Sequence, residues 1–217
     1  MSRNRLFPLP VAGPFGIDQI SQYVRELTMP FIDQILDLYA ARGAEHYGED
    51  VSQSEHAEQC AHHARADGAS DDLIVAALLH DVGHLLQKQG ADAADRGIDT
   101  HHERIGSGFL ARGFSKAVTE PIALHVEAKR FLATVEAGYI DRLSAASLQS
   151  LALQGGPMSD AECDAFRANP YHDAALKLRG YDEMGKIVGA TPAPVASYAE
   201  LLRALTIAPA MTSAASV

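Results

Sequence analysis

Three polar side chains interrupt the most hydrophobic stretch of the chain, LIVAALLHDVGHLL at residues 73–86. His80 and His84 are four residues apart, so on a helix both project from one face, and Asp81 lies about 100° around the axis from His80. A hydrogen-bonded core residue is the ordinary explanation for one such histidine. It does not account for two with an adjacent carboxylate, because an unpaired buried carboxylate is strongly unfavourable. A metal ion would supply the missing counter-charge.

The other histidines of the chain fall into three groups by their surroundings. Three lie beside apolar helical patterns that would turn them inward: His56, His102 and His125. Three lie at expected helix ends, where solvated imidazoles are ordinary: His62, His63 and His101. Two lie in polar settings, where spacing decides nothing: His46 and His172. The inward group therefore gives the further candidate ligands.

Helical patterns run through almost the whole chain, with apolar residues three and four apart and no strand-like alternation. Three Ser/Thr-x-x-Glu pairs resemble capping boxes, at 52–55, 100–103 and 159–162, and Thr119-Glu-Pro is typical of a helix start. We expect helices near 18–28, 30–42, 52–67, 71–88, 101–113, 120–133, 144–154, 159–167, 170–187 and 196–206. These elements form one all-α helical bundle over 17–207, after an irregular arm (1–16) and before a loose tail (208–217). The polar segment 89–99 is expected to flank a site.

Composition restricts the classes of function. The chain has 217 residues, 47% of them hydrophobic and 21% charged, which suits a globular domain. Its net charge of −10 argues against a nucleic-acid partner but leaves room for an anionic small molecule in a local basic pocket. No apolar run approaches the roughly 20 residues of a membrane helix, and the N-terminus does not resemble a signal peptide. We therefore expect a cytoplasmic protein without a membrane partner, whose oligomeric state the sequence leaves open.

The order of these candidates along the chain resembles that of the HD-domain superfamily. It has an early histidine, a His-Asp pair, two later histidines and a distal aspartate, all on expected helices. The resemblance covers about residues 46–186 and implies a helical bundle with six metal ligands: His56, His80, Asp81, His102, His125 and Asp182. Six such ligands suit two cations better than one, and imidazole with carboxylate suits iron, with manganese and zinc as alternatives. Asp81 would then bridge the metals, with His56, His80 and Asp182 at one and His102 and His125 at the other.

Five blocks of sequence resemble one branch of that superfamily, the phosphonate-degrading oxygenases. The blocks are YGEDVSQSEHAEQCA (47–61), LLHDVGHLL (78–86), HVEAKRFL (125–132), SLALQGGPMS (150–159) and LRGYDEMGK (178–186). The branch implies two iron ions in a mixed-valent Fe(II)/Fe(III) centre, with O2 as co-substrate. The implied reaction cleaves the C–P bond of a 1-hydroxy-2-(amino or trimethylammonio)ethylphosphonate to glycine or glycine betaine plus phosphate. It also implies a 2-oxoglutarate-dependent hydroxylase acting upstream.

Two cations lie one helical turn from proposed ligands, Lys129 four residues after His125 and Arg179 three residues before Asp182. Beside two metals they would form a pocket for a dianion such as a phosphonate, unless both are merely solvated surface charges. His84, one turn beyond His80, is expected to hydrogen-bond the same anion.

Three further residues are candidates for contact with the substrate. Ser147 would offer a hydroxyl, or is an ordinary helix-surface serine. The resemblance implies that Glu49 meets a substrate amine and that a tyrosine near it, Tyr47, occupies an open iron position, with His46 as the alternative. From spacing alone, Glu49 is equally a carboxylate that favours a helix N-terminus.

Two other functions stay open. Most HD-domain proteins are metal-dependent phosphohydrolases, so hydrolysis of a phosphomonoester or nucleotide is the first alternative. The second is a metal-stabilised helical module without catalysis, which would not need an anion pocket beside open metal positions.

Overall fold

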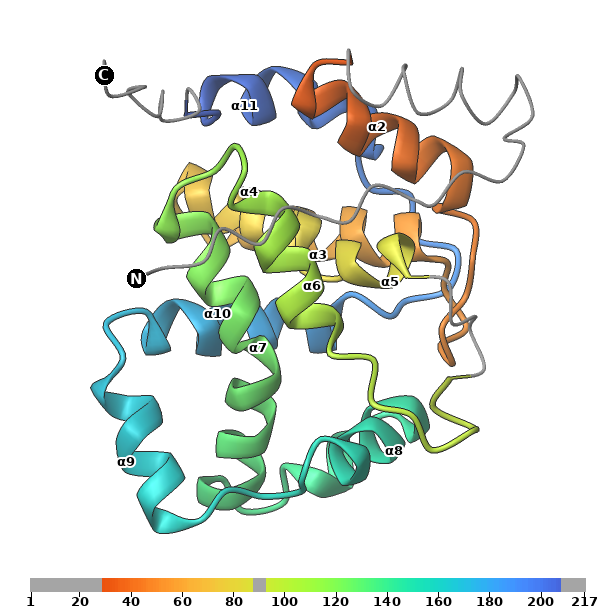
Figure 1. Cartoon of the computed structure of the whole chain (residues 1–217). Coiled ribbons are helices and arrows are strands. Elements are labelled where there is room, and N and C mark those ends of the chain that lie inside the picture. The colour runs from red at the N-terminus through yellow and green to blue at the C-terminus, as the bar shows by residue number, and fades with distance from the viewer. Residues whose placement is uncertain (1–28, 88–92, 208–217) are drawn as a thin grey trace, which may run out of the picture.

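The computed structural model describes residues 29–87 and 93–207. Every regular element in these two ranges is helical, so the chain is all-α (Figure 1). The helices are α2 (Phe31–Arg42), α3 (Gln53–Ala66), α4 (Asp71–Leu79), α5 (Val82–Leu86), α6 (His102–Leu110), α7 (Lys116–Val135), α8 (Ala145–Leu153), α9 (Asp160–Ala168), α10 (His172–Met184) and α11 (Ala199–Ala204), with 3-10 turns η1 (Ile140–Arg142) and η2 (Val195–Tyr198). The arm 1–16, the helix expected near 18–28 and the tail 208–217 lie outside the described residues.

Two of the three expected capping boxes start helices as predicted. At α3 the Glu55 amide donates to Ser52 Oγ at 3.3 Å, while the Ser52 amide donates to the Glu55 carboxylate at 2.8 Å. Ser159 and Glu162 form the same reciprocal pair at α9. Each box satisfies two amides that the first turn of a helix leaves without partners.

The prediction of a third capping box, between Thr100 and Glu103, is wrong. Helix α6 starts at His102, and the residue before it, His101, has a left-handed backbone with φ of 49°. Asp99 explains the difference, because its carboxylate accepts the His101 amide at 3.1 Å and lies 3.1 Å from His101 Nδ1. This local bond holds the chain out of the helix and leaves the Glu103 side chain to be buried beside His102.

The expected start of a helix at Thr119-Glu-Pro is also wrong. Helix α7 starts one turn earlier, at Lys116 after Ser115, so Pro121 lies inside it. Proline removes one backbone hydrogen bond at that point. The helix is 20 residues long and Pro121 is buried, so the remaining ladder and the packing outweigh that loss.

The single helix expected over 71–88 is two helices, and the break falls at the His-Asp pair. Helix α4 ends before His80, and Asp81 (φ −98°, ψ 7°) precedes α5, whose His84 amide bonds to the Asp81 carbonyl at 2.9 Å. All seven residues from Leu73 to Leu79 are buried. The most hydrophobic segment of the chain therefore carries the His-Asp pair into the centre of the molecule.

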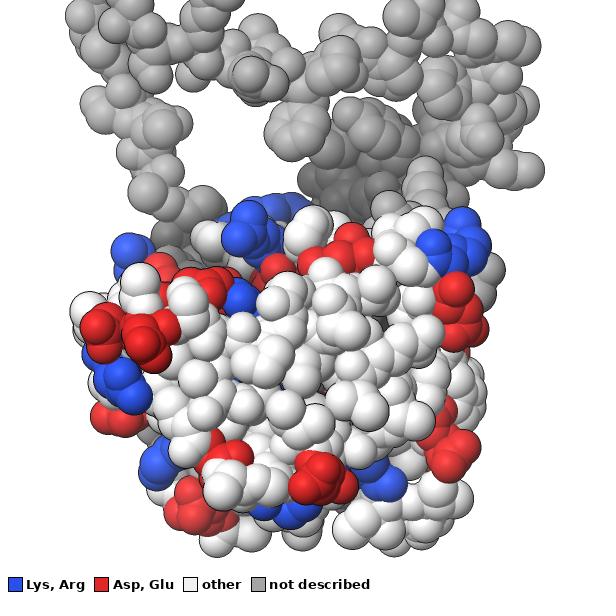
Figure 2. Space-filling model, turned by 90° about the horizontal axis from the view of Figure 1, so that it is seen from below, with Lys and Arg blue, Asp and Glu red and all other residues white. Residues whose placement is uncertain are grey.

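Helices α3, α4, α7 and α10 form the centre of the bundle. Helix α3 packs against α4 and α10, and α7 packs against α4, α6 and α10. Helices α8 and α9 lie at the lower end of the molecule in Figure 1, where a second small core joins α7, α9 and α10 through Phe131 and Phe166. Among the described helices, none is both long and apolar enough to cross a lipid bilayer. The lower face has a broad uncharged centre, with scattered charges of both signs towards its edge (Figure 2).

Candidate metal centre and adjoining pocket

Six side chains from five parts of the bundle converge on one point in its interior. Helix α3 supplies one, the α4–α5 break two, and α6, α7 and α10 one each: His56, His80, Asp81, His102, His125 and Asp182. These are the six residues that the resemblance to the HD-domain superfamily implied as metal ligands. The structure brings all of them together.

The imidazoles form two close pairs. The Nε2 atoms of His56 and His80 are 3.3 Å apart, and those of His102 and His125 are 3.0 Å apart. Two nitrogens that bind the same cation at 2.0–2.1 Å lie about 2.8–3.4 Å apart when the angle between the two bonds is near 90–110°. The spacing of both pairs is therefore that of neighbouring ligands on a metal ion.

Asp81 lies between the two pairs. Its Oδ2 is 3.7 Å from His56 Nε2, and its Oδ1 lies 3.4–3.7 Å from the Nε2 atoms of His80, His102 and His125. Asp182 lies beside the first pair only, with Oδ1 3.4 Å from His56 Nε2. One carboxylate can thus serve both pairs, and the other serves one.

Backbone carbonyls fix the orientation of three of the four rings. The Nδ1 atoms of His56, His80 and His125 lie 2.7–3.0 Å from carbonyl oxygens. A carbonyl only accepts, so Nδ1 carries the proton and Nε2 presents a lone pair to the centre. In the His56–His80 pair two such lone pairs would face each other at 3.3 Å, an arrangement that a bound cation relieves, and the hydrogen bond at Nδ1 is the usual support of a metal-ligating histidine. The residues present therefore fit a pair of metal ions.

The carboxylates of the centre are ionised. Burial raises the pKa of Asp182, but the Arg179 guanidinium beside it outweighs burial and holds that pKa well below its usual range. The pKa of Asp81 is also well below its usual range, because the imidazoles of His80 and His102 outweigh burial. Burial lowers the pKa of His125 far enough to keep that ring neutral. Against burial, Cys60 and Asp182 raise the pKa of His56, and Asp81 raises the pKa of His102, so these two rings release a proton when a metal ion binds. Two carboxylates and four imidazoles then suit divalent or trivalent cations.

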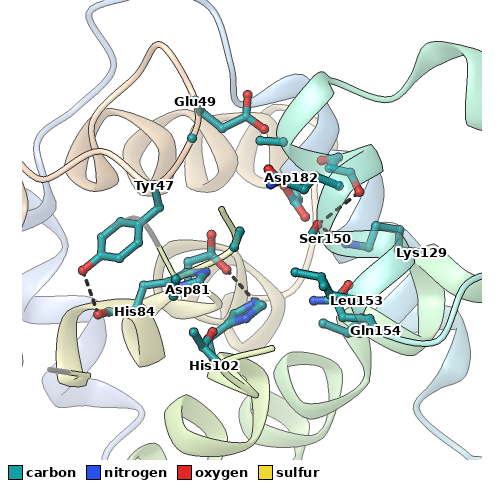
Figure 3. A pocket seen from close by; sticks show the side chains of 18 of the residues that line it. Tyr47, Glu49, Asp81, His84, His102, Lys129, Ser150, Leu153, Gln154 and Asp182 are labelled. Atoms are coloured by element: carbon teal, nitrogen blue, oxygen red, sulfur yellow. Dashed lines mark hydrogen bonds and ion pairs between the residues drawn. The ribbon is translucent and has the colours of Figure 1, made fainter. Parts of the chain in front are cut away.

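A pocket of about 200 Å³ opens onto these donors. In Figure 3, Lys129 and Ser150 lie across it from Tyr47 and His84, with Asp81 between the two sides and His102 below. The described part of the expected flanking segment, residues 93–99, supplies part of the wall. The pocket thus joins the proposed ligands to the residues expected to bind substrate.

Both expected cations lie in the pocket and neither is a solvated surface charge. Lys129 is buried and donates to Ser150 Oγ at 2.8 Å, and burial, with Arg179 nearby, lowers its pKa to about 7. Arg179 is buried and donates to Asp182, while its Nε lies 3.0 Å from the Tyr139 hydroxyl. Arg179 Nη2 is buried and has no hydrogen-bond partner among the described residues, so one donor of the guanidinium is unsatisfied.

His84 and Tyr47 stack in sequence beside the second imidazole pair. The His84 ring lies 4.1 Å from the His102 ring, and the Tyr47 ring lies 4.8 Å from His84 on its other side. Burial lowers the pKa of His84 to about 3, so the ring is neutral and can donate one hydrogen bond. The Tyr47 hydroxyl instead contacts Glu45 and the His84 carbonyl, at 2.7 and 3.0 Å, and so is not directed at the ligands. His46, its alternative, is exposed and does not line the pocket.

Glu49 and Ser147 line the pocket, and both contact a residue that the sequence analysis did not select. Lys186 Nζ lies 2.6 Å from Glu49 Oε1 and 2.9 Å from Ser147 Oγ. Its spacing, four residues after Asp182, repeats that of Lys129 after His125 and was the signal that could have identified it. Ser150, three residues after Ser147, was missed in the same way.

The remaining histidines lie apart from the centre, as expected for His62, His63 and His101, none of which is buried. His172, the first residue of α10, lies 2.8 Å from the Asn169 carbonyl through its Nδ1. One buried neighbour of the centre was not expected. Cys60 Sγ lies 3.7 Å from His56 Nε2. Spacing carried this signal as well, since Cys60 follows His56 by one turn.

Comparison with known proteins gives one family match and several relatives. The model of the HD domain family matches residues 40–174, which include every converging residue except Asp182. The chain is 45% identical over 160 residues to a hydroxymethylphosphonate dioxygenase of Gimesia maris, covering 73% of this chain and 79% of that protein. It is 39% identical over 168 residues to a [1-hydroxy-2-(trimethylamino)ethyl]phosphonate dioxygenase (glycine-betaine-forming) of Leisingera caerulea, covering 77% and 84%. An uncharacterized protein of Acanthamoeba polyphaga mimivirus is 36% identical over 175 residues, covering 79% and 80%.

Proposed function

The chain belongs to the HD domain family and is an oxygenase, and from this premise we propose that it cleaves the carbon–phosphorus bond of a 1-hydroxyalkylphosphonate with consumption of dioxygen. The observation that carries the proposal is the placement of Lys129 and Arg179 on a pocket that opens onto two pairs of imidazole donors. A non-catalytic helical module has no need of this combination.

The proposed reaction balances without a further oxidant or reductant. A 1-hydroxyalkylphosphonic acid and O2 give a carboxylic acid and phosphoric acid. The bond between C1 and phosphorus breaks, C1 gains one oxygen atom and phosphorus gains the other. Carbon is oxidised and dioxygen is fully reduced, so one O2 is consumed for each phosphate released.

The metal ligands proposed for this chemistry are the six converging residues. His56, His80 and Asp182 would hold one iron, His102 and His125 the other, and Asp81 would bridge them. Bound iron in a mixed-valent Fe(II)/Fe(III) pair supplies the activation of dioxygen and the removal of hydrogen from C1. The donor set supports iron, since imidazole with carboxylate is a common iron environment.

The protein's own contribution is to position the substrate and balance its charge. Lys129 and Arg179 bind the phosphonate dianion, and Arg179 Nη2, which has no partner among the described residues, leaves one donor for it. Ser150, already bonded to Lys129, and Ser147 offer hydroxyls on the α8 wall. His84 donates one hydrogen bond as a neutral ring. Orientation and charge, not proton transfer by these side chains, then select the bond that breaks.

The nature of the substrate beyond the 1-hydroxyphosphonate group is a separate matter. The resemblance in sequence points to 2-amino or 2-trimethylammonio substrates, with glycine or glycine betaine as product. The two relatives with named activities differ on this point, because only the Leisingera caerulea protein is named for a substrate that contains a nitrogen atom. In each case the 1-hydroxyl must be introduced first, and a 2-oxoglutarate-dependent hydroxylase is the class of enzyme that we propose upstream.

The test couples two measurements on anaerobically prepared, iron-loaded protein. With hydroxymethylphosphonate and 2-amino-1-hydroxyethylphosphonate as substrates, an oxygen electrode should record one O2 consumed per phosphate released. No phosphate should form without oxygen. Protein carrying His62→Ala, a change away from the centre, should behave as the unmodified chain does.

The alternative function makes the opposite forecast. A phosphohydrolase would release phosphate from a phosphomonoester at the same rate with and without oxygen. Oxygen-independent turnover of 4-nitrophenyl phosphate, with no reaction of either phosphonate in oxygen, would refute the oxygenase proposal.

A further inference from the structure

Lys186 is a third cation in the pocket, and the proposed reaction gives it no role. It follows the end of α10 by two residues and lines the pocket wall. Its Nζ contacts Glu49 Oε1 at 2.6 Å and Ser147 Oγ at 2.9 Å, and lies 4.0 Å from Asp182 Oδ1. An ammonium group belonging to the protein thus already lies beside Glu49.

The backbone around Lys186 is held on both sides. The Gly185 carbonyl lies 2.9 Å from His56 Nδ1, and the Ile187 amide donates to Gln59 Oε1 at 2.9 Å while its carbonyl accepts from Gln59 Nε2 at 3.1 Å. A Cβ at Gly185 would approach Cys60 Sγ to 2.5 Å, so only glycine lets the chain pass this close to α3. Lys186 is therefore anchored to the pocket and is not a mobile surface lysine.

Glu49 is anchored from the opposite side. Its Oε1 accepts from Ser144, the N-cap residue of α8, at 2.6 Å as well as from Lys186. The side chains of Glu49 and Lys186 are 23% and 18% exposed, so water screens their attraction less than at an open surface. A substrate ammonium reaching Glu49 would have to compete with this built-in ion pair and approach a like charge.

The pocket also lacks the features that bind a methylated ammonium. Quaternary ammonium groups are recognised by cages of aromatic rings. Among the described residues that line the pocket, Tyr47 is the one phenylalanine or tyrosine, and the chain has no tryptophan. One face of Tyr47 is covered by His84. A single half-covered ring does not make a cage.

The charges that remain match an anion without a cationic end. With Glu49 and Lys186 neutralising each other, the phosphonate is left with Lys129, the unpaired Nη2 of Arg179, whose other nitrogens pair with Asp182 and Glu183, and the proposed metal ions. Resting on the function proposed above, we propose that Lys186 is a specificity-determining residue. By pairing with Glu49 it makes the pocket select 1-hydroxyalkylphosphonates that carry no cationic nitrogen over their 2-amino and 2-trimethylammonio counterparts.

The experiment measures binding, so it does not depend on turnover. Iron-loaded protein is titrated calorimetrically without oxygen with two ligands that differ only by an ammonium group, 1-hydroxyethylphosphonate and 2-amino-1-hydroxyethylphosphonate. A charge-assisted contact changes affinity roughly ten- to a hundredfold, so the unmodified chain should bind the nitrogen-free ligand at least about tenfold more tightly.

Variants assign the preference to the ion pair. Lys186→Gln keeps a donor for Glu49 but removes the positive charge, so affinity for the aminated ligand should rise at least about tenfold. Adding Glu49→Gln to it should abolish that gain. Lys177→Met, on an exposed lysine of α10, is the matched control and should change neither affinity. Lys186→Met serves if the glutamine variant fails to retain its metals.

Each outcome bears on a different claim. Equal or tighter binding of the aminated ligand by the unmodified chain would overturn the specificity proposal and leave the oxygenase proposal standing. A preference that survives both Lys186 substitutions would show that another residue causes it, and would overturn the role of Lys186. Failure of both phosphonates to bind would overturn the proposed function, and this inference with it.

Discussion

We expect the buried ammonium group of Lys129 to lower the free energy of unfolding of the protein. Its side chain is 4% exposed, and burial, aided by Arg179, lowers its pKa from 10.5 to about 7. Between these two pH values the unfolded chain holds a proton that the folded chain has released. Stability therefore rises with pH across that window, by about 1.4 kcal/mol per pH unit. Below pH 7 both states hold the proton, and the full cost of about 5 kcal/mol applies.

Replacing Lys129 with methionine tests this reasoning. The thioether fills similar space without charge, so the buried ammonium no longer opposes folding, while the lost hydrogen bond to Ser150 removes about 1 kcal/mol. In metal-free protein at pH 7 we expect Lys129→Met to raise the free energy of unfolding by about 3 kcal/mol. The same substitution should abolish tight phosphonate binding. Urea unfolding with a chelator present, at pH 7 and pH 9, measures the first effect.

The pH dependence separates desolvation from other effects of the substitution. The stability difference between Lys129→Met and the unmodified chain should shrink by about 1.4 kcal/mol for each pH unit between 7 and 9, because other groups titrate alike in both. Lys116→Met, at the exposed start of the same helix, should change stability by less than about 0.5 kcal/mol. A Lys129→Met protein no more stable than the original at pH 7, with the same dependence on pH, would refute the argument.

Two further substitutions test the centre itself. Asp81→Asn keeps the shape but not the charge of the proposed bridge, so elemental analysis of anaerobically prepared protein should show the loss of most of both metals. The control His62→Ala should keep them. Two metals in the Asp81 variant would exclude a bridging role. Gly185→Ala places a methyl 2.5 Å from Cys60 Sγ and should destabilise the protein by about 1–3 kcal/mol in chemical denaturation. Gly108→Ala, in open space on α6, should be neutral or stabilising, and equal effects of the two glycine changes would contradict the close packing at Gly185.

The sequence predicted the helices and the convergence of the metal-ligand set for a physical reason. Helix periodicity and serine caps are local properties, and the boundaries of α3 and α9 follow from them directly. Histidines inside apolar helical patterns must be buried, and a bundle has one interior. That is why His56, His102 and His125, far apart in sequence, meet at the His80-Asp81 break.

What the sequence did not predict depends on contacts between distant segments. Asp99 overrides the cap expected at Thr100, and the packing of α7 outweighs the local preference of Pro121 for a first turn. Lys186 shows the same limit at the pocket. Its spacing from Asp182 was visible, but its pairing with Glu49, 137 positions away, exists only after folding.

Helix α8 has a consequence for how proteins of this kind diverge. None of the six converging donors comes from α8, which instead supplies Ser147 and Ser150 to the pocket and Ser144 to Glu49. Mutations in α8 can therefore change which phosphonate is accepted without altering a single proposed ligand. Natural selection, or a combinatorial library confined to residues 144–154, can explore new substrates while the oxygen chemistry is retained. Two relatives that are 45% and 39% identical to this chain are named for different substrates. A helix that contacts the substrate but supplies no metal ligand allows such divergence.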